Sequence, residues 1–152
     1  MTQTFGQGYE ATTLAAGHAE GVVLVLDAPL SFWGGFDATT GRITDQHHPQ
    51  VGVVLTRRVL VMPGGRGSSS SSSVLAEAIR AETAPAAIVL READPIIALG
   101  AIVAAELYGR QMPVVAVDAR LYQGLHSGQR IAIVATAAET ARISLLGAST
   151  AR

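Results

Sequence analysis

The sequence predicts a mixed α/β domain in which strands and helices alternate beside a β-rich part. Two observations carry this prediction. Short runs of β-branched and aliphatic residues, typical of strands buried on both faces, recur along the chain. In the second half these runs alternate with helix-like segments, which implies parallel strands joined by crossover helices. With 152 residues, of which 49% are hydrophobic, the chain is most simply one domain, residues 1–152, with its own core.

The first half is rich in strand candidates and turns. Residues 21–27, 51–55 and 59–62 are short apolar runs that we expect to form strands. Residues 37–42 have the composition of a turn that returns the chain. Together they give this half the character of a β-meander.

The second half contains the clearer helices. An amphipathic helix is expected from about Val74. Another is expected over residues 95–108, because Asp94 before it suits an N-cap and Gly109 after it suits a C-cap. The strands expected around these helices are residues 86–90, 113–117, 131–135 and, as a final strand or an edge piece, 142–146.

The composition excludes several classes of function. A net charge of −1 gives no reason to expect nucleic acid or an anionic membrane as a partner. All eleven basic residues are arginine, so a P-loop lysine and a Schiff-base lysine are both excluded. The chain has no cysteine and therefore no disulfide, no thiolate nucleophile and no cysteine-held iron–sulfur cluster of its own. A function that needs such a cluster would take it from another chain.

Neither a membrane segment nor an export signal is expected. The first ten residues lack the charged and apolar regions of a signal peptide. The longest apolar run, residues 96–107, is too short to cross a bilayer and contains Glu106. We therefore expect a cytoplasmic protein. Its mean hydropathy of +0.34 indicates either a large surface for a protein partner or simply a compact α/β core.

The most informative stretch is residues 63–73, in which Pro-Gly-Gly-Arg-Gly precedes six serines. It lies between a strand candidate and an amphipathic helix. A glycine-rich loop at a helix N-terminus presents backbone N–H groups to one point, which suits a phosphate or a carboxylate. The alternative is a flexible linker, but a linker here would leave two pieces too small for comfortable cores. We favour a functional loop, with Ser71, Ser72 or Ser73 as the N-cap.

Three familiar loop motifs do not match this stretch. A Walker A loop requires a lysine, a nucleophile elbow requires Gly-x-Ser-x-Gly, and a dinucleotide fingerprint requires glycines nearer the helix. What remains is anion binding by backbone N–H groups, Arg66 and the serine hydroxyls. A serine held there could also act as a base, because the helix N-terminus and a nearby cation both favour its alkoxide.

Two further candidate sites are weaker. His47 and His48 with Asp45 contain the residue types of an iron-binding triad. Adjacent side chains on an extended chain point in opposite directions, however, so we expect solvated loop histidines. Trp33 beside two glycines could stack on a ligand, but a lone tryptophan more often packs on the core, and we expect packing.

Residues 29–37, the turn at 40–43, the His48–Pro49 pair and the loop at 65–68 together resemble the small subunit of the aconitase X family. The resemblance covers about residues 17–117. It implies an α/β fold of the swivelling β/β/α type, like the fourth domain of aconitase. It also implies a hydro-lyase made of two parts, fused or separate, whose large part carries iron or an iron–sulfur cluster. The implied partner is thus a large catalytic subunit, with no cofactor and no metal on this chain.

The resemblance further implies roles for single residues of the loop. Ser68, the first serine after Gly67, matches the serine base of the family. Arg66, Gly67 and Ser69 would contact the substrate. Aconitase follows its paired serines with an arginine where this chain has Ser70, so the resemblance supplies no arginine contact from that position.

The family that the chain resembles has at least two known activities, and the substrate in each of these two is a small hydroxy acid. One dehydrates cis-3-hydroxy-L-proline in bacterial catabolism, and the other dehydrates mevalonate 5-phosphate in an archaeal isoprenoid route. The lysine-free, alanine- and arginine-rich composition indicates a high-GC genome and favours the bacterial reaction. Eliminating water needs both a base and a Lewis acid, so we expect the chain to be inactive alone. The rival hypothesis is a non-catalytic module that binds an anionic metabolite or serves in assembly.

Overall fold

The computed structural model describes residues 8–147, so residues 1–7 and 148–152 of the predicted single domain lie outside it. The main strands are β1 (Gly8–Ala15), β2 (Gly17–Val25), β5 (Val59–Met62), β6 (Ala87–Leu90), β7 (Val114–Ala116), β8 (Arg130–Ala135) and β9 (Thr140–Leu145). The remaining elements are helices α1 (Phe32–Gly35), α2 (Ser71–Ala81), α3 (Pro95–Tyr108) and α4 (Ala119–Gly124) and the short strands β3 (Phe36–Asp37) and β4 (Arg42–Ile43).

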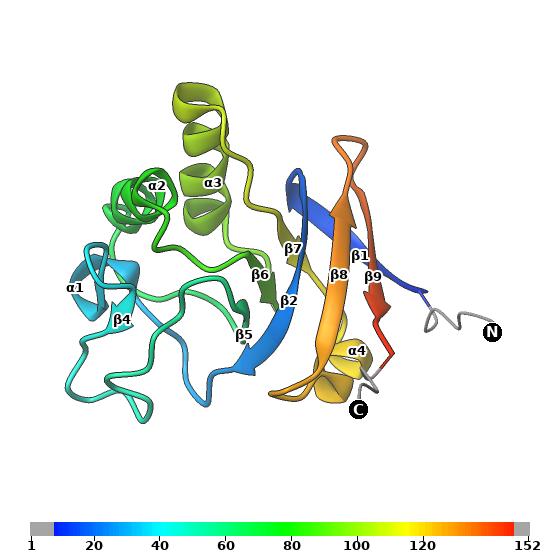
Figure 1. Ribbon diagram of the computed structural model, residues 1–152, viewed down its shortest axis with the longest axis horizontal. Coiled ribbons are helices and arrows are strands. Elements are labelled where there is room, and N and C mark those ends of the chain that lie inside the picture. Colours follow the sequence, from blue (N-terminus) through cyan, green and yellow to red (C-terminus); the bar gives the residue numbers. More distant parts are fainter. Residues whose placement is uncertain (1–7, 148–152) are drawn as a thin grey trace.

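The main strands close into a barrel in the order β1-β7-β6-β5-β2-β8-β9, and β3 pairs with β4 in a separate hairpin. Helices α1, α2 and α3 gather on one side of the barrel, while α4 lies near one end of β8 and β9 (Figure 1). No helix among residues 8–147 has the length and apolar character needed to cross a bilayer.

The barrel has a parallel half and an antiparallel half. Strands β2, β5, β6 and β7 run parallel, and α2 and α3 form the crossovers that the alternating pattern predicts. Strand β1 pairs antiparallel with β7 and β9, and β8 pairs antiparallel with β2 and β9. The predicted β-meander in the first half is therefore wrong, because β2 pairs with β5 in parallel, and β1 pairs with β7 and β9 instead of with β2.

The helix over residues 95–108 is confirmed with both of its predicted caps. The Asp94 carboxylate accepts hydrogen bonds from the amides of Ile96 (2.9 Å) and Ile97 (3.3 Å). At the other end Gly109 adopts φ +66°, in the left-handed region where glycine is favoured. The strands predicted at 59–62, 86–90, 113–117 and 131–135 are confirmed to within a few residues, and the last candidate is a full strand, β9.

The strand predicted at residues 51–55 is wrong. Residues 51 and 52 form a turn, and Val54 makes only an isolated antiparallel bridge with Arg42 of β4. Beside that bridge the Ile43 amide donates to Val53 O (2.9 Å) and the Gly52 amide donates to Ile43 O (2.8 Å). Gly52 has φ +91°, a conformation that reverses the chain and prevents an extended run.

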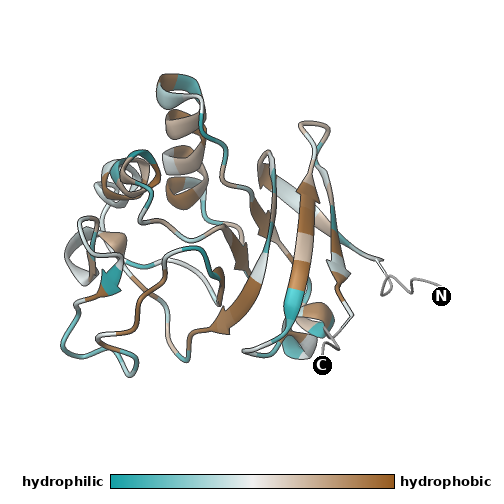
Figure 2. Cartoon of the chain, viewed as in Figure 1, coloured by the Kyte–Doolittle hydropathy of each residue, from teal (hydrophilic) through white to brown (hydrophobic). Residues whose placement is uncertain are grey.

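The core forms two layers that share the parallel strands. Along β5, Val59 and Val61 face the barrel interior, whereas Leu60 and Met62 face the layer beneath the helices. This alternation follows from the two-residue period of a strand. It also explains why β5 and β6 are hydrophobic throughout, as expected of strands buried on both faces (Figure 2).

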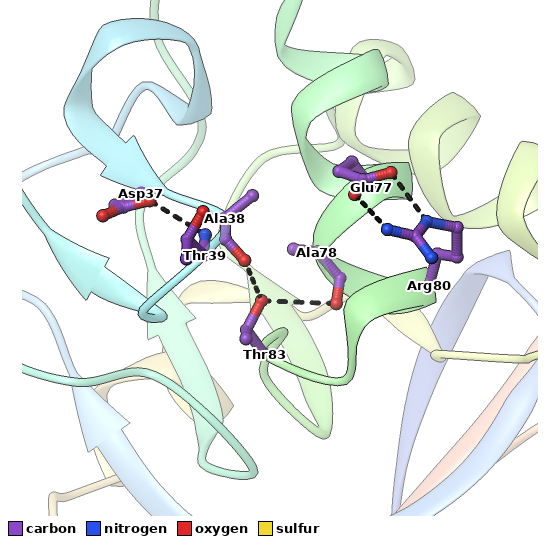
Figure 3. Close-up of polar contacts among 7 residues, drawn as sticks. All are labelled: Asp37, Ala38, Thr39, Glu77, Ala78, Arg80 and Thr83. Carbon is purple, nitrogen blue, oxygen red and sulfur yellow. Dashed lines mark hydrogen bonds and ion pairs between the residues drawn. The ribbon is translucent and has the colours of Figure 1, made fainter.

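Polar contacts attach the β3–β4 hairpin to the end of α2 (Figure 3). The Thr83 hydroxyl donates to the carbonyls of Ala38 (2.6 Å) and Ala78 (3.4 Å). The Thr83 amide also donates to the carbonyl of Ala78 (2.9 Å). One turn earlier, Arg80 donates to both carboxylate oxygens of Glu77 (2.9 and 2.5 Å), which lowers the pKa of Glu77. The segment between β2 and β5 is thus held against the helix that follows the serine run.

Candidate functional site

A pocket of about 240 Å³ opens where the glycine–serine loop enters α2. Its lining residues are Leu30, Phe32, Gly65, Arg66, Gly67, Ser68, Ser71, Asp94, Ile96 and Ile97. They come from the segments that follow β2, β5 and β6. Because the carboxyl ends of adjacent parallel strands meet at one edge of a sheet, these loops converge there. A larger hollow of about 520 Å³ beside α4 is lined by none of the residues singled out from the sequence.

Ser68 lies in this pocket, half-buried, with its hydroxyl oxygen held in place by a hydrogen bond. The Ser70 amide donates to Ser68 Oγ at 2.9 Å. A donor aimed at the oxygen favours its charged form, and so does the nearby N-terminus of α2. The position predicted for a base thus has one hydrogen-bond donor on its oxygen and lies just before the start of α2.

Two of the three predicted substrate contacts also line the pocket. Arg66 is exposed, and its guanidinium makes no hydrogen bond or ion pair with any residue that the structure describes. Gly67 has φ +101°, and a Cβ there would collide with the Ser31 side chain. Ser69 is exposed and lies outside the set of lining residues. The loop thus brings Arg66, Gly67 and Ser68 together and leaves Ser69 at the edge.

The amides available to an anion differ from those expected. In the first turn of α2, the amides of Ser71, Ser72 and Ser73 donate to the carbonyls three residues earlier, at 3.0 to 3.2 Å. Within the described chain, the amides of residues 67–69 make no hydrogen bond. The N-cap is Ser70, one residue before the predicted set, and its side chain makes no capping bond. An anion would therefore meet the amides of the loop, and those of the helix are already used.

The serines that follow Ser70 have separate structural roles. Ser71 is buried and accepts a hydrogen bond from the Trp33 amide (3.1 Å), which ties α1 to α2. The Ser72 hydroxyl donates to the carbonyl of Ile96 (2.7 Å), which ties α2 to α3. The Ser73 hydroxyl donates within its own turn at 3.2 Å. Two of the three therefore fasten the loop to its neighbours.

Asp94 is a pocket residue that the sequence interpretation treated only as a helix cap. One of its oxygens accepts the α3 amides, and the other faces Gly65, where a Cβ would lie only 2.5 Å from it. Leu30, from the segment after β2, forms a parallel bridge with Gly65. The alternation of strands and helices in the sequence could have indicated that Asp94 lies near the glycine–serine loop, because loops that follow adjacent parallel strands converge.

Trp33 does not pack on the core, and that expectation is wrong. Its side chain is 57% exposed. The buried position belongs to its neighbour Phe32, whose ring meets that of Phe36 edge to face at 5.1 Å between centroids. Trp33 therefore stands at the surface directly beside a pocket-lining residue.

His48 is not solvated as expected, because only 5% of it is exposed. Its Nδ1 accepts the Gln50 amide (3.0 Å), so the proton lies on Nε2, which donates to the carbonyl of Ala28 (3.1 Å). His47 is exposed as predicted. Among residues 8–147 no group of three or more His, Asp or Glu side chains could hold a metal ion. His48 instead supports the backbone that leads into residues 29–37.

Comparison with known proteins decides the family. The protein-family model described as "Aconitase X swivel domain" matches residues 8–143 of this chain. The chain belongs to this family. The family resemblance and the swivelling α/β fold predicted from the sequence are thereby confirmed.

Solved and curated relatives agree with this membership. The crystal structure of aconitase X from Thermococcus kodakaraensis, in its holo-form, superposes with a TM-score of 0.80 at 31% identity, covering 93% of this chain and all of that one. The cis-3-hydroxy-L-proline dehydratase of Pseudomonas aeruginosa is 53% identical over 108 residues, which are 71% of this chain and 19% of the relative. The phosphomevalonate dehydratase small subunit of Methanothermobacter thermautotrophicus is 47% identical over 95 residues, which are 62% of this chain and 72% of the relative.

The two kinds of relative differ in length. The chain spans about a fifth of the hydroxyproline dehydratases that it matches. By contrast, the match covers 72% of the archaeal protein, whose name makes it a small subunit. The swivel domain thus occurs both within long chains and as a short one.

Proposed function

We propose that this chain is the swivelling small subunit of a two-part aconitase X-type hydro-lyase, and that it supplies Ser68 as the base for dehydration of a small hydroxy acid. The observation that carries the proposal is the Ser68 oxygen, held in the pocket by the Ser70 amide. Arg66, a cation without a partner among the described residues, lines the same pocket. Membership of the swivel-domain family agrees with this role.

The chemistry assigned to this chain is proton removal and carboxylate binding. Dehydration removes a proton from one carbon while hydroxide leaves the neighbouring carbon. The proton removal therefore needs a base placed beside the first carbon. Donation from the Ser70 amide lowers the free energy of the Ser68 alkoxide. The Arg66 guanidinium and the free amides of residues 67–69 would hold the substrate carboxylate. Ser69, at the pocket edge, would contact the substrate once the site is closed.

The second half of the reaction would belong to the large subunit. This chain has no cysteine, and its described residues offer no cluster of metal ligands, so they do not fit an iron or iron–sulfur centre. That centre, on the partner, would act as the Lewis acid for the departing hydroxyl. The small-subunit names among the relatives imply such a partner. A cytoplasmic heterodimer is the assembly we propose.

The substrate that we favour is cis-3-hydroxy-L-proline. The support is the match to the Pseudomonas aeruginosa enzyme, which is 53% identical over 108 residues, against 47% over 95 residues and 52% over 83 residues for two archaeal small subunits. The alternative is mevalonate 5-phosphate, favoured by the small-subunit relatives, of which this chain covers more. Both reactions would use the same base and the same carboxylate contacts, and they differ in what the large subunit recognises.

Reconstitution with the large subunit tests the proposal. The pair should turn over one of the two substrates, and each subunit alone should not. Ser68→Ala should lower kcat about 10²- to 10⁴-fold, the usual contribution of a placed base, with assembly unchanged. Ser73→Ala is the matched control, because its hydroxyl bonds only within its own turn.

Two outcomes would contradict the proposal in different ways. Normal turnover by Ser68→Ala would exclude Ser68 as the base. A reconstituted pair that turns over neither substrate, while this chain alone binds the carboxylate ligand, would identify a non-catalytic binding module.

A further inference from the structure

Helix α3 is apolar on the face that it turns outward as well as on the face that it buries. Ile97, Ala101 and Ala104 are buried in the core. On the outer side, Leu99 is 50% exposed and Ile102 is 44% exposed. A helix at the surface of a globular protein normally places polar residues there.

We call the outward stripe formed by Ile96, Leu99 and Ile102 the α3 outer face, whereas Val103 packs partly against the core. Its members recur at helical spacing on one side of α3, and each is exposed or half-buried. The first charged residue along the helix is Glu106, near its end. A contiguous apolar stripe of this kind marks a site of contact with another protein.

The α3 outer face begins at the rim of the pocket. Ile96 lines the pocket, and its carbonyl accepts the Ser72 hydroxyl. Leu99 lies one turn further along α3. On the other flank stands Trp33, next to the pocket-lining Phe32 and bonded through its amide to Ser71. Helix α2 lies between α1 and α3 (Figure 1). Phe32 from α1 and Ile96 from α3 both line the pocket.

We infer that the α3 outer face and Trp33 form the docking surface for the large subunit. This inference rests on the proposed function, because that function requires a partner to close over Ser68. A body that covers the pocket must pass over the lining residues Phe32 and Ile96. Exposed apolar side chains follow each of them in the chain, Trp33 directly after Phe32 and Leu99 one turn after Ile96. Interface cores are depleted in charge and enriched in aromatic residues, which matches this surface. Burying these side chains would also keep water from the pocket.

The test measures affinity instead of turnover. Purified large subunit is titrated into the labelled full chain, and Kd is obtained for Ile102→Asp, Leu99→Asp and Trp33→Ala. Each should weaken binding at least about thirtyfold, as for a residue in the centre of an interface. Val134→Asp is the matched control, because Val134 is also 44% exposed but lies on β8, on the side of the barrel away from α1, α2 and α3 (Figure 1).

Several results would overturn the inference. Unchanged affinity in both Ile102→Asp and Leu99→Asp, with native circular dichroism, would exclude the α3 outer face. Equal losses in Val134→Asp would show that the effect is not local. If the chain alone sediments as a dimer that Ile102→Asp dissociates, with large-subunit binding intact, the surface joins two copies of this chain.

The same measurements separate this inference from the proposed function. Ser68→Ala should bind the large subunit with the affinity of the unmodified chain. If it also turns over normally, Ser68 is not the base, yet the docking result stands. If Ile102→Asp binds normally while Ser68→Ala is inactive, only the docking surface is wrong.

Discussion

Helices α2 and α3 both follow a buried parallel strand and both begin at the pocket, yet they begin in opposite ways. Asp94 caps α3 with a carboxylate that accepts hydrogen bonds from two backbone amides, and a proline follows Asp94 in the chain. Helix α2 begins after Ser70, whose side chain makes no capping bond. The amides of its first turn are satisfied by backbone carbonyls of the loop itself.

This difference gives the start of α3 a structural role and makes the start of α2 a candidate binding site. At α3 the side chain that could bind a ligand is already used to secure the helix. At α2 the backbone closes the helix start, Ser68 lines the pocket, and the amides of residues 67–69 make no hydrogen bond within the described chain. A glycine-rich loop therefore becomes a candidate site when its helix does not need its side chains as caps.

The largest expected effect comes from the point where the two helix starts touch. Gly65→Ala would place a methyl group 2.5 Å from Asp94 Oδ2 and 2.7 Å from Ile97 Cδ1. Such overpacking should lower the free energy of unfolding by about 1–3 kcal/mol, as measured by denaturant titration. Gly64→Ala is the control, because a Cβ there meets nothing within 4 Å. Equal stability of the two variants would show that the loop is not held against α3.

The next effect compares the two caps directly. Asp94→Ala should lower stability by about 1 kcal/mol, the usual cost of losing an N-cap, because two amides of α3 lose their acceptor. Ser70→Ala should change stability by less than about 0.5 kcal/mol, as surface substitutions usually do, since its hydroxyl caps nothing. A larger loss in Ser70→Ala than in Asp94→Ala would reverse the comparison.

The smallest effect concerns a carboxylate that accepts a hydrogen bond from a backbone amide outside any helix. The Thr39 amide donates to the Asp37 carboxylate at 2.8 Å, which lowers the pKa of Asp37 below its ordinary value of 3.8. A carboxyl group whose pKa is lower in the folded state stabilises the protein at pH values above its ordinary pKa. This stabilisation is lost as the pH falls through the pKa of the folded state. The stability difference between the unmodified chain and Asp37→Asn should therefore shrink as pH falls below about 4, as measured by unfolding at several pH values. A difference that stays constant down to pH 2 would contradict the shift.

What the sequence could predict depends on how local the cause is. Helix α3 is predicted to the residue, because Asp94 and Gly109 determine its ends within a few positions. Strand β1 was missed, since its residues are small or polar and its partner strand β9 lies at the other end of the chain. No local pattern reports such a pairing.

The candidate site divides in the same way. Arg66, Gly67 and Ser68 could be found because they are contiguous. Asp94 joins them only through the register of β5 with β6. The choice between Phe32 and Trp33 for the buried position depends on which ring fits beside Phe36, and neighbouring aromatic residues do not reveal that from composition.

The closed barrel has a mechanical consequence. Because β1 pairs with β9, Gly8 lies opposite Ser144, and the described chain enters and leaves the barrel at one place, away from α1 and α2 (Figure 1). A body tethered at a single point can turn about that pivot without bending any of its own strands.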